Sequence, residues 1–158
     1  MIPDRLVEAG VWVVALLLLI VFVPADKRRE AALSIVFMQF IAWILGLLAV
    51  EMNLLSYPVR FFSMANSASF TFEFCALPIV GALYNVNFPT SSAPWRRWAY
   101  AAAFPTALTA IEYPIERYTE LVEYIHWHLS WTWVSEFVVL IGCRMFYDWF
   151  YRRRPLVL

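Results

Sequence analysis

The sequence predicts an all-α integral membrane protein, a bundle of five transmembrane helices with its N-terminus outside and its C-terminus in the cytoplasm. Hydrophobic residues make up 63% of the 158 residues and charged residues 15%, whereas a soluble domain is about 45–50% apolar and about 25% charged. Several apolar runs approach the ~20 residues that a membrane-spanning helix requires. Because no long linker divides these runs, we expect a single transmembrane domain over residues 1–158.

The first two spans are expected at about 6–24 and 31–53. The first contains the run VWVVALLLLIVFV. A signal peptide carries positive charge before its apolar run, whereas here the basic cluster at 27–29 follows it, so we interpret the run as a retained helix. In the second span, Ala42 and Gly46 form a pair of small residues that allows helices to pack closely.

The remaining spans are expected at about 68–88, 95–114 and 129–151. They are separated by the sequence PTSSAP at 89–94, which is rich in turn-forming residues, and by the segment 115–128. Six alanines give the fourth span a slim profile that lets neighbouring backbones approach it. We therefore expect the fourth span to be the central helix of the bundle.

The segment 115–128 begins with an amphipathic pattern. Ile115 and Tyr118 are spaced as on one face of a helix, while charged residues such as Glu116 occupy the other faces. This pattern predicts either an amphipathic helix on the outer surface or a continuation of the fourth span beyond Pro114. Two roles stay open for the segment, an ordinary solvated face and a partner-binding face.

The distribution of basic residues predicts the orientation. Nine of the twelve fall on one side of the expected spans: Lys27, Arg28, Arg29, Arg96, Arg97, Arg144, Arg152, Arg153 and Arg154. Arg5, Arg60 and Arg117 fall on the other side. Because cytoplasmic loops carry an excess of Lys and Arg, the side with nine basic residues is expected to be cytoplasmic.

Four glutamates lie inside the expected spans: Glu51, Glu73, Glu112 and Glu136. An ionisable side chain in hydrocarbon costs from ~2.5 to well over ~10 kcal/mol, and such residues commonly mark functional sites. At ~1.5 Å per residue, the span boundaries place all four in the outer third of the membrane, where Glu8 of the first span is able to join them. We therefore expect an acidic pocket that opens outward.

Further polar side chains are expected to belong to this pocket. Thr109, Glu112 and Glu116 follow one another at intervals of three or four residues and form one polar stripe on the fourth span. Two arginines are expected to supply counter-charges, and His126 is expected to act as a gate or proton-responsive partner, because histidine is the side chain whose ordinary pKa is closest to neutral pH. The predicted pocket residues are Glu51, Glu73, Glu112, Glu116, Glu136, Arg60, Arg117, His126 and Thr109.

Three interpretations stay open for the carboxylates, because they cannot all remain ionised and unpaired in a low dielectric. They line a water-filled vestibule for a cation, a basic small molecule or protons. Alternatively, Glu112, Glu116 and His126 hold a divalent metal, or the carboxylates are paired between helices and only fix packing. No catalytic residue and no cofactor is predicted, since GxSxG is absent and two histidines spaced as His126 and His128 do not face together on a helix.

These features predict an integral membrane protein that binds or transports a small cation, a proton or an amphiphile. Two alternatives remain: a non-catalytic accessory or structural subunit of a larger membrane complex, and a membrane-embedded enzyme that acts on lipid. The chain is small for a complete carrier, so the expected partners are the lipid bilayer, further copies of the chain or a membrane complex. Nucleic-acid binding is not expected, because the basic clusters flank apolar runs, where orientation explains them.

Four motifs carry a resemblance to a known family: SYPVR at 56–60, SFTFEF at 69–74, the E-x3-E-R-Y-T run that ends at Thr119, and YIHW…WTW at 124–133. In these motifs the chain resembles the small, uncharacterised multi-pass membrane proteins of endospore-forming Gram-positive bacteria, and the similarity extends over nearly the whole length. The resemblance implies a sporulation-associated protein of the plasma membrane or the spore inner membrane with about five helices. It implies no activity.

Overall fold

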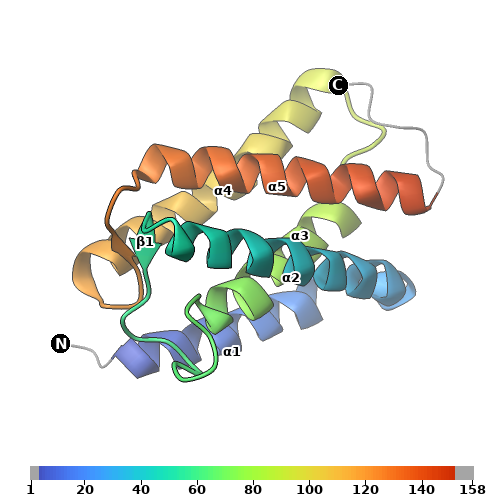
Figure 1. Cartoon of the computed structure of the whole chain (residues 1–158). Coiled ribbons are helices and arrows are strands. Elements are labelled where there is room, and N and C mark those ends of the chain that lie inside the picture. The colour runs from blue at the N-terminus through green and yellow to red at the C-terminus, as the bar shows by residue number, and fades with distance from the viewer. Residues whose placement is uncertain (1–3, 152–158) are drawn as a thin grey trace.

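The computed structural model describes residues 4–151 and is built almost entirely of helices (Figure 1). The elements in chain order are α1 (Asp4–Phe22), the 3-10 turn η1 (Ala25–Lys27), α2 (Arg28–Glu51), β1 (Leu55–Ser56), the π-helical η2 (Phe72–Ala76), α3 (Leu77–Val86), α4 (Pro94–Tyr118), β2 (Glu123–Tyr124) and α5 (Leu129–Phe150). The all-α class that the composition predicts is therefore observed, with one short two-stranded ribbon added.

Within the described residues, three helices are long and apolar enough to cross a membrane. They are Asp4–Phe22, Ala25–Glu51 and Leu129–Phe150, with mean hydropathies of 2.3, 2.4 and 1.2. The helix Phe72–Val86 is apolar but shorter, and α4 carries charged residues near both of its ends. Length and composition therefore support a membrane location through three of the five expected spans.

The central helix is α3, not α4. From Leu77 to Val86 every residue except Val80 is buried, because α1, α2, α4 and α5 all pack against this helix. In α4 only Ala101 and Pro105 are buried. The expectation of a central fourth span was wrong because small residues permit close approach without requiring it, whereas a helix that is apolar on all sides is the one that becomes enclosed.

The close packing of α2 on α3 depends on a glycine. A Cβ atom built on Gly81 would lie 2.6 Å from Cγ of Met38, a separation that real side chains do not tolerate. Met38 is fully buried at this contact. The bare Cα of Gly81 therefore lets the Met38 side chain fill the interface between the two helices.

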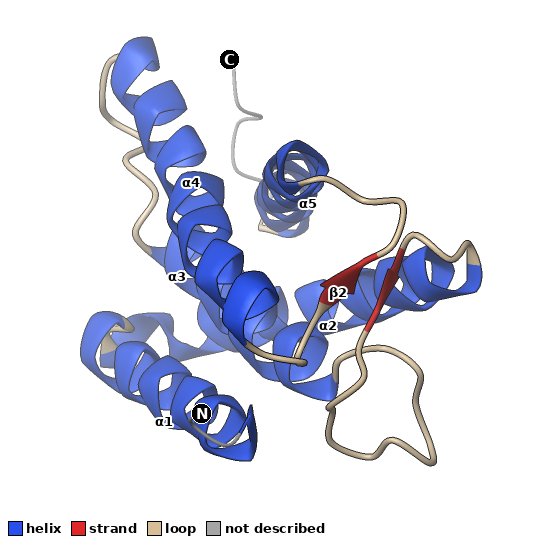
Figure 2. Cartoon of the chain, turned by 90° about the vertical axis from the view of Figure 1, so that its left-hand side faces the viewer, coloured by secondary structure: helices blue, strands red, loops and turns tan. Residues whose placement is uncertain are grey.

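One end of the bundle is closed by a β-ribbon, which lies toward the viewer in Figure 2, where α5 is seen nearly end-on. Helix α2 stops at Glu51 because Asn53 takes a left-handed conformation (φ 56°), a common way to end a helix. The chain then forms β1, which pairs antiparallel with β2 through Leu55 opposite Tyr124. We call this end, where α1 begins and α2 ends, the ribbon end.

At the ribbon end, the segment 115–128 forms the last turn of α4 and then the strand β2. Helix α4 continues through Pro114 to Tyr118, as the second alternative predicted. The expectation of a surface helix beyond that point was wrong, because the chain becomes extended at Thr119 and forms β2. Hydrogen bonds to the other strand and its flanking loop satisfy this backbone instead.

The opposite end of the bundle holds a buried polar group of residues, the Arg144 cluster, which comprises Glu30, Asn85, Arg144, Tyr147 and Asp148. Arg144 is 2% exposed, and its Nη2 lies 2.7 Å from Oδ1 of Asp148. Its Nη1 donates to the carbonyl of Asn85 at 3.1 Å, and Tyr147 donates to Glu30. Arg144 was counted among the orienting charges, but the structure places it inside the bundle. Arg152, Arg153 and Arg154 lie outside the described residues.

Candidate functional site

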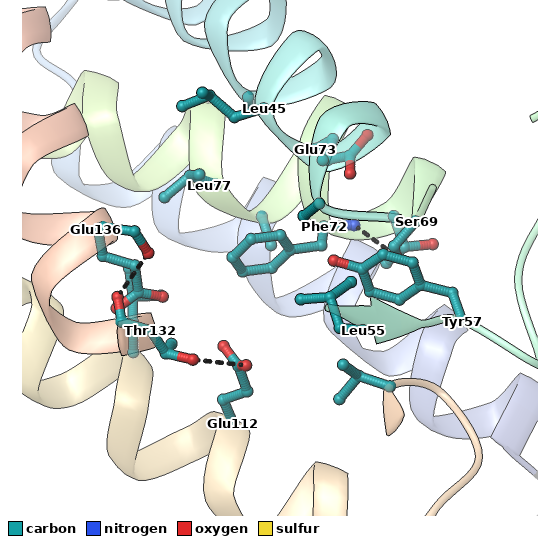
Figure 3. A pocket seen from close by; sticks show the side chains of 18 of the residues that line it. Leu45, Leu55, Tyr57, Ser69, Phe72, Glu73, Leu77, Glu112, Thr132 and Glu136 are labelled. Atoms are coloured by element: carbon teal, nitrogen blue, oxygen red, sulfur yellow. Dashed lines mark hydrogen bonds between the residues drawn. The ribbon is translucent and has the colours of Figure 1, made fainter. Parts of the chain in front are cut away.

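A cavity of about 440 Å³ lies at the ribbon end, between α2, η2, α3, α4 and α5. Its wall is mainly apolar, with contributions from residues such as Leu45, Leu77, Leu108 and Val139. Figure 3 shows three glutamates among the side chains around it. The polar side chains of the wall are Glu8, Tyr57, Ser69, Thr71, Glu73, Glu112, Trp127, Thr132, Ser135 and Glu136.

Glu73 is the most completely enclosed of these three carboxylates. It lies in η2, is 1% exposed, and neither of its carboxylate oxygens has a hydrogen-bond partner. The carboxylate rests against Gly46 of α2, where an added Cβ would lie 1.7 Å from Oε1. The single π-helical turn is a feature that occurs often at functional sites. Gly46 and η2 together hold an unpartnered carboxylate at the cavity wall.

Glu112 of α4 is held by the segment that forms the ribbon. The hydroxyl of Tyr124 in β2 donates to Oε1 of Glu112, and the hydroxyl of Thr132 in α5 donates to the same oxygen at 3.3 Å. Trp127 in turn donates to Thr132 at 2.9 Å. This network ties α4, α5 and the loop between them to one carboxylate.

Glu136 of α5 is buried but only half satisfied. Its side chain is 4% exposed, and Oε2 accepts from Thr109 of α4 at 3.3 Å. Oε1 is buried without a hydrogen-bond partner. Because Thr132 precedes Glu136 by four residues, both lie on the same face of α5, the face that looks into the cavity.

Glu8 is the satisfied carboxylate of the wall. Its Oε1 accepts from the backbone N–H of Phe61 at 3.0 Å and from Thr71 at 2.9 Å. Its Oε2 lies 2.9 Å from Nη1 of Arg5. With both oxygens engaged, Glu8 ties α1 to the loop after β1 and to the helix that carries Glu73.

The ribbon end of the cavity is closed by a small apolar cluster around Leu55, Tyr57 and Val122. Burial raises the pKa of the Tyr57 phenol well above its ordinary value, and the charges of Glu73 and Glu112 raise it further. The phenol therefore remains protonated at physiological pH and is able to donate a hydrogen bond into the cavity.

Of the nine predicted pocket residues, Glu73, Glu112 and Glu136 line one cavity, and Thr109 bonds to the last of them. The other five are placed elsewhere: Glu51, Glu116, Arg60, Arg117 and His126 are absent from the cavity wall. Arg60 donates to three backbone carbonyls of its own loop, and neither it nor Arg117 forms an ion pair within residues 4–151.

The proposed metal ligands are not brought together. His126 is exposed, and its Nδ1 lies 3.1 Å from the carbonyl of Asn53 in the loop that precedes β1. Glu116 is half-buried on α4, outside the cavity wall. In the described part of the chain, no group of three or more His, Cys, Asp or Glu side chains is arranged to hold a metal ion.

The cavity wall also contains polar residues that were not among the predicted pocket residues, including Tyr57, Trp127 and Thr132. A signal existed for Thr132, because it precedes Glu136 by one helical turn on the same span. Tyr57 and Trp127 lie in irregular segments, where no periodicity indicates direction, and only tertiary contacts bring them to the cavity.

Comparison with protein-family models, with curated proteins and with solved structures finds no match for this chain.

Proposed function

We propose that this protein is an integral membrane protein that binds a small organic cation with an apolar body in the cavity at the ribbon end. The observation that carries the proposal is the wall of this cavity. It combines an apolar surface with Glu73 and Glu136, two buried glutamates of the wall that carry carboxylate oxygens without a hydrogen-bond partner. A volume of about 440 Å³ is within the range of ~300–1,000 Å³ typical of small-molecule sites.

The carboxylates of the wall favour a ligand with a positive charge. A buried carboxylate must be protonated, paired with a cation or fully hydrogen-bonded, because isolated charge is costly in a low dielectric. Within residues 4–151 no Lys, Arg or His forms an ion pair with Glu73, Glu112 or Glu136. An ammonium group satisfies the carboxylates, and the carbon body attached to it covers the apolar wall.

The topology that we propose places the cavity in the outer half of the membrane. The five helices run as five spans with the N-terminus outside and the C-terminus in the cytoplasm. The arrangement of charge supports this orientation, because the basic clusters at 27–29 and 96–97 both lie at the end of the bundle opposite the ribbon. Cytoplasmic loops are the ones that carry such clusters. The cavity then opens toward the outside of a plasma membrane or spore membrane.

The proposal is tested by calorimetric titration of the purified full-length protein in nanodiscs of zwitterionic lipid. The ligands are hexylammonium, hexanol and hexanoate, which share one carbon chain and differ in charge. We expect saturable binding of hexylammonium alone, above the signal of empty nanodiscs. The double variant Glu73→Gln/Glu136→Gln should weaken binding by at least ~10-fold, since it removes two charge-assisted interactions.

Glu51→Gln is the matched control, because Glu51 is an exposed carboxylate outside the cavity. It should bind hexylammonium as the unaltered protein does. Equal binding of hexanol and hexylammonium, or an unchanged affinity in the double variant, would contradict the proposal. Absence of any binding would favour the alternative of an accessory subunit whose carboxylates serve the fold.

A further inference from the structure

The unpartnered carboxylates lie on two sides of the cavity. Figure 3 shows Glu73 on one side of the Phe72 ring and the pair Glu112 and Glu136 on the other. Glu73 comes from η2 and rests against Gly46 of α2. Glu112 and Glu136 come from α4 and α5, which Thr132 links by its bond to Glu112. The cavity therefore has two acidic poles.

Each pole has at least one carboxylate oxygen that lacks a hydrogen-bond partner and that a cation would pair with. At the first pole, both oxygens of Glu73 are buried without a hydrogen-bond partner. At the second pole, Oε1 of Glu136 is in the same condition, although Oε2 accepts from Thr109. A single positive charge that binds at one pole therefore leaves the carboxylate oxygens of the other pole unpaired.

The wall between the poles is apolar. Phe72 and Leu77 extend into the space between Glu73 and Glu136, and Leu108 and Val139 contribute to the same wall. No arrangement of three acidic, histidine or cysteine side chains within residues 4–151 is close enough to share one metal ion. A compact ion, even a divalent one, therefore does not bridge the two poles.

From this geometry we infer that the ligand is a linear diammonium compound, with two cationic ends separated by a hydrocarbon spacer. The inference rests on the proposed function and specifies its ligand class. One ammonium group binds at Glu73 and the other at Glu136 and Glu112, while the spacer lies along Phe72 and Leu77. No bond is made or broken in this step, and the ligand enters and leaves unchanged.

Tyr57 is placed to assist both poles. The charges of Glu73 and Glu112 both act on its phenol and raise its pKa, so the side chain lies within electrostatic reach of each pole. Its ring belongs to the apolar cluster that closes the ribbon end. Because the phenol stays neutral, it keeps the O–H group that is able to donate a hydrogen bond into the cavity.

The test compares α,ω-diaminoalkanes of three to eight carbons with n-alkylamines of the same lengths, by calorimetric titration of the full-length protein in nanodiscs of zwitterionic lipid. We expect one chain length at which the diamine binds ~10-fold to 100-fold more tightly than the monoamine, the contribution of one further charge-assisted interaction. Shorter and longer diamines should lose this advantage.

Single variants locate the poles. Glu73→Gln and Glu136→Gln should each reduce the affinity for the best diamine to that for the matched monoamine, while the monoamine still binds at the remaining pole. Gly46→Ala displaces the Glu73 carboxylate without changing the charge of the chain and should act like Glu73→Gln. This variant keeps the test decisive if a glutamine variant does not fold. Gly142→Ala is its control, since a Cβ there meets nothing within 4 Å.

The outcomes separate the inference from the function on which it rests. If monoamines bind and no diamine binds more tightly, the two-pole inference is overturned and the proposed function stands. If neither class binds in the millimolar range, both are overturned. If a diamine advantage survives in Glu73→Gln and in Glu136→Gln, the second ammonium group binds elsewhere and the inference is overturned.

Discussion

The two ends of this bundle bury ionisable side chains in opposite ways. In the Arg144 cluster the guanidinium of Arg144 faces the carboxylate of Asp148 at 2.7 Å, and its remaining N–H groups include one that donates to the carbonyl of Asn85. At the ribbon end the buried ionisable groups of the cavity are carboxylates and phenols, and Glu73 has no partner on either oxygen.

The two ends differ in the charges that they bring together. The Arg144 cluster carries both signs of charge and sits beside the ring of Phe88, 4.4 Å from the guanidinium, so its charges are satisfied within the fold. At the ribbon end, the wall of the cavity carries acidic side chains but no Lys, Arg or His around a space of about 440 Å³. A buried charge that is paired stabilises a particular helix arrangement, whereas one that faces a cavity unpaired indicates a ligand.

The largest effect is expected from Asp148→Asn. This change leaves the buried Arg144 charge without a counter-charge and should lower the free energy of unfolding by about 3–5 kcal/mol. The measurement is an unfolding titration with sodium dodecyl sulfate in mixed micelles. The double variant Arg144→Met/Asp148→Leu removes both charges and should recover more than half of the loss. A single variant within about 0.5 kcal/mol of the unaltered protein would show that the cluster is not needed for stability.

The sequence could predict the Arg144 cluster only in part. Arg144 and Asp148 are four residues apart, and this spacing brings opposite charges together on a helix. The contact with the end of α3 has no local signal, because Asn85 is 59 residues away from Arg144. The burial of Arg144 near the end of α5 could not be predicted either, since the depth of a residue near a helix end depends on which neighbours cover it.

An effect of opposite sign is expected at the ribbon end. Glu73→Met replaces two buried, unpartnered oxygens by apolar atoms and should raise the free energy of unfolding by about 1–3 kcal/mol, while the affinity for the best diamine falls to that for the matched monoamine. The same unfolding titration measures it. Glu112→Met is the matched control and should be destabilising, because it removes the acceptor of the Tyr124 and Thr132 hydroxyls, of which only one can then donate to the other. Equal destabilisation by both variants would mean that Glu73 serves the fold.

The sequence predicted that glutamates of different spans lie together, but it did not predict correctly which of them do so. Three carboxylates from different expected spans line one cavity because their distances from the span ends place them at a similar depth. Glu51 and Glu116 fail to join them for reasons that depth does not capture. Glu51 is the exposed last residue of α2, and Glu116 is absent from the cavity wall although its neighbour Ile115 belongs to it. The direction in which a side chain points from its helix depends on how the helices pack, and this packing cannot be read from the sequence.

The smallest effect is expected from Tyr124→Phe, which removes one hydrogen bond to Glu112 and should lower the free energy of unfolding by about 1 kcal/mol. Burial, and then the charge of Glu112, raise the pKa of Tyr124. Above about pH 10, the ordinary pKa of tyrosine, the phenol ionises in the unfolded chain but not in the folded protein, so the unaltered protein loses stability as pH rises. The difference in free energy of unfolding between the unaltered protein and Tyr124→Phe should therefore become smaller above that pH. Tyr118→Phe, at a 75% exposed position, should leave the free energy of unfolding nearly unchanged. A pH-independent difference for Tyr124→Phe would contradict a pKa raised by burial and by Glu112.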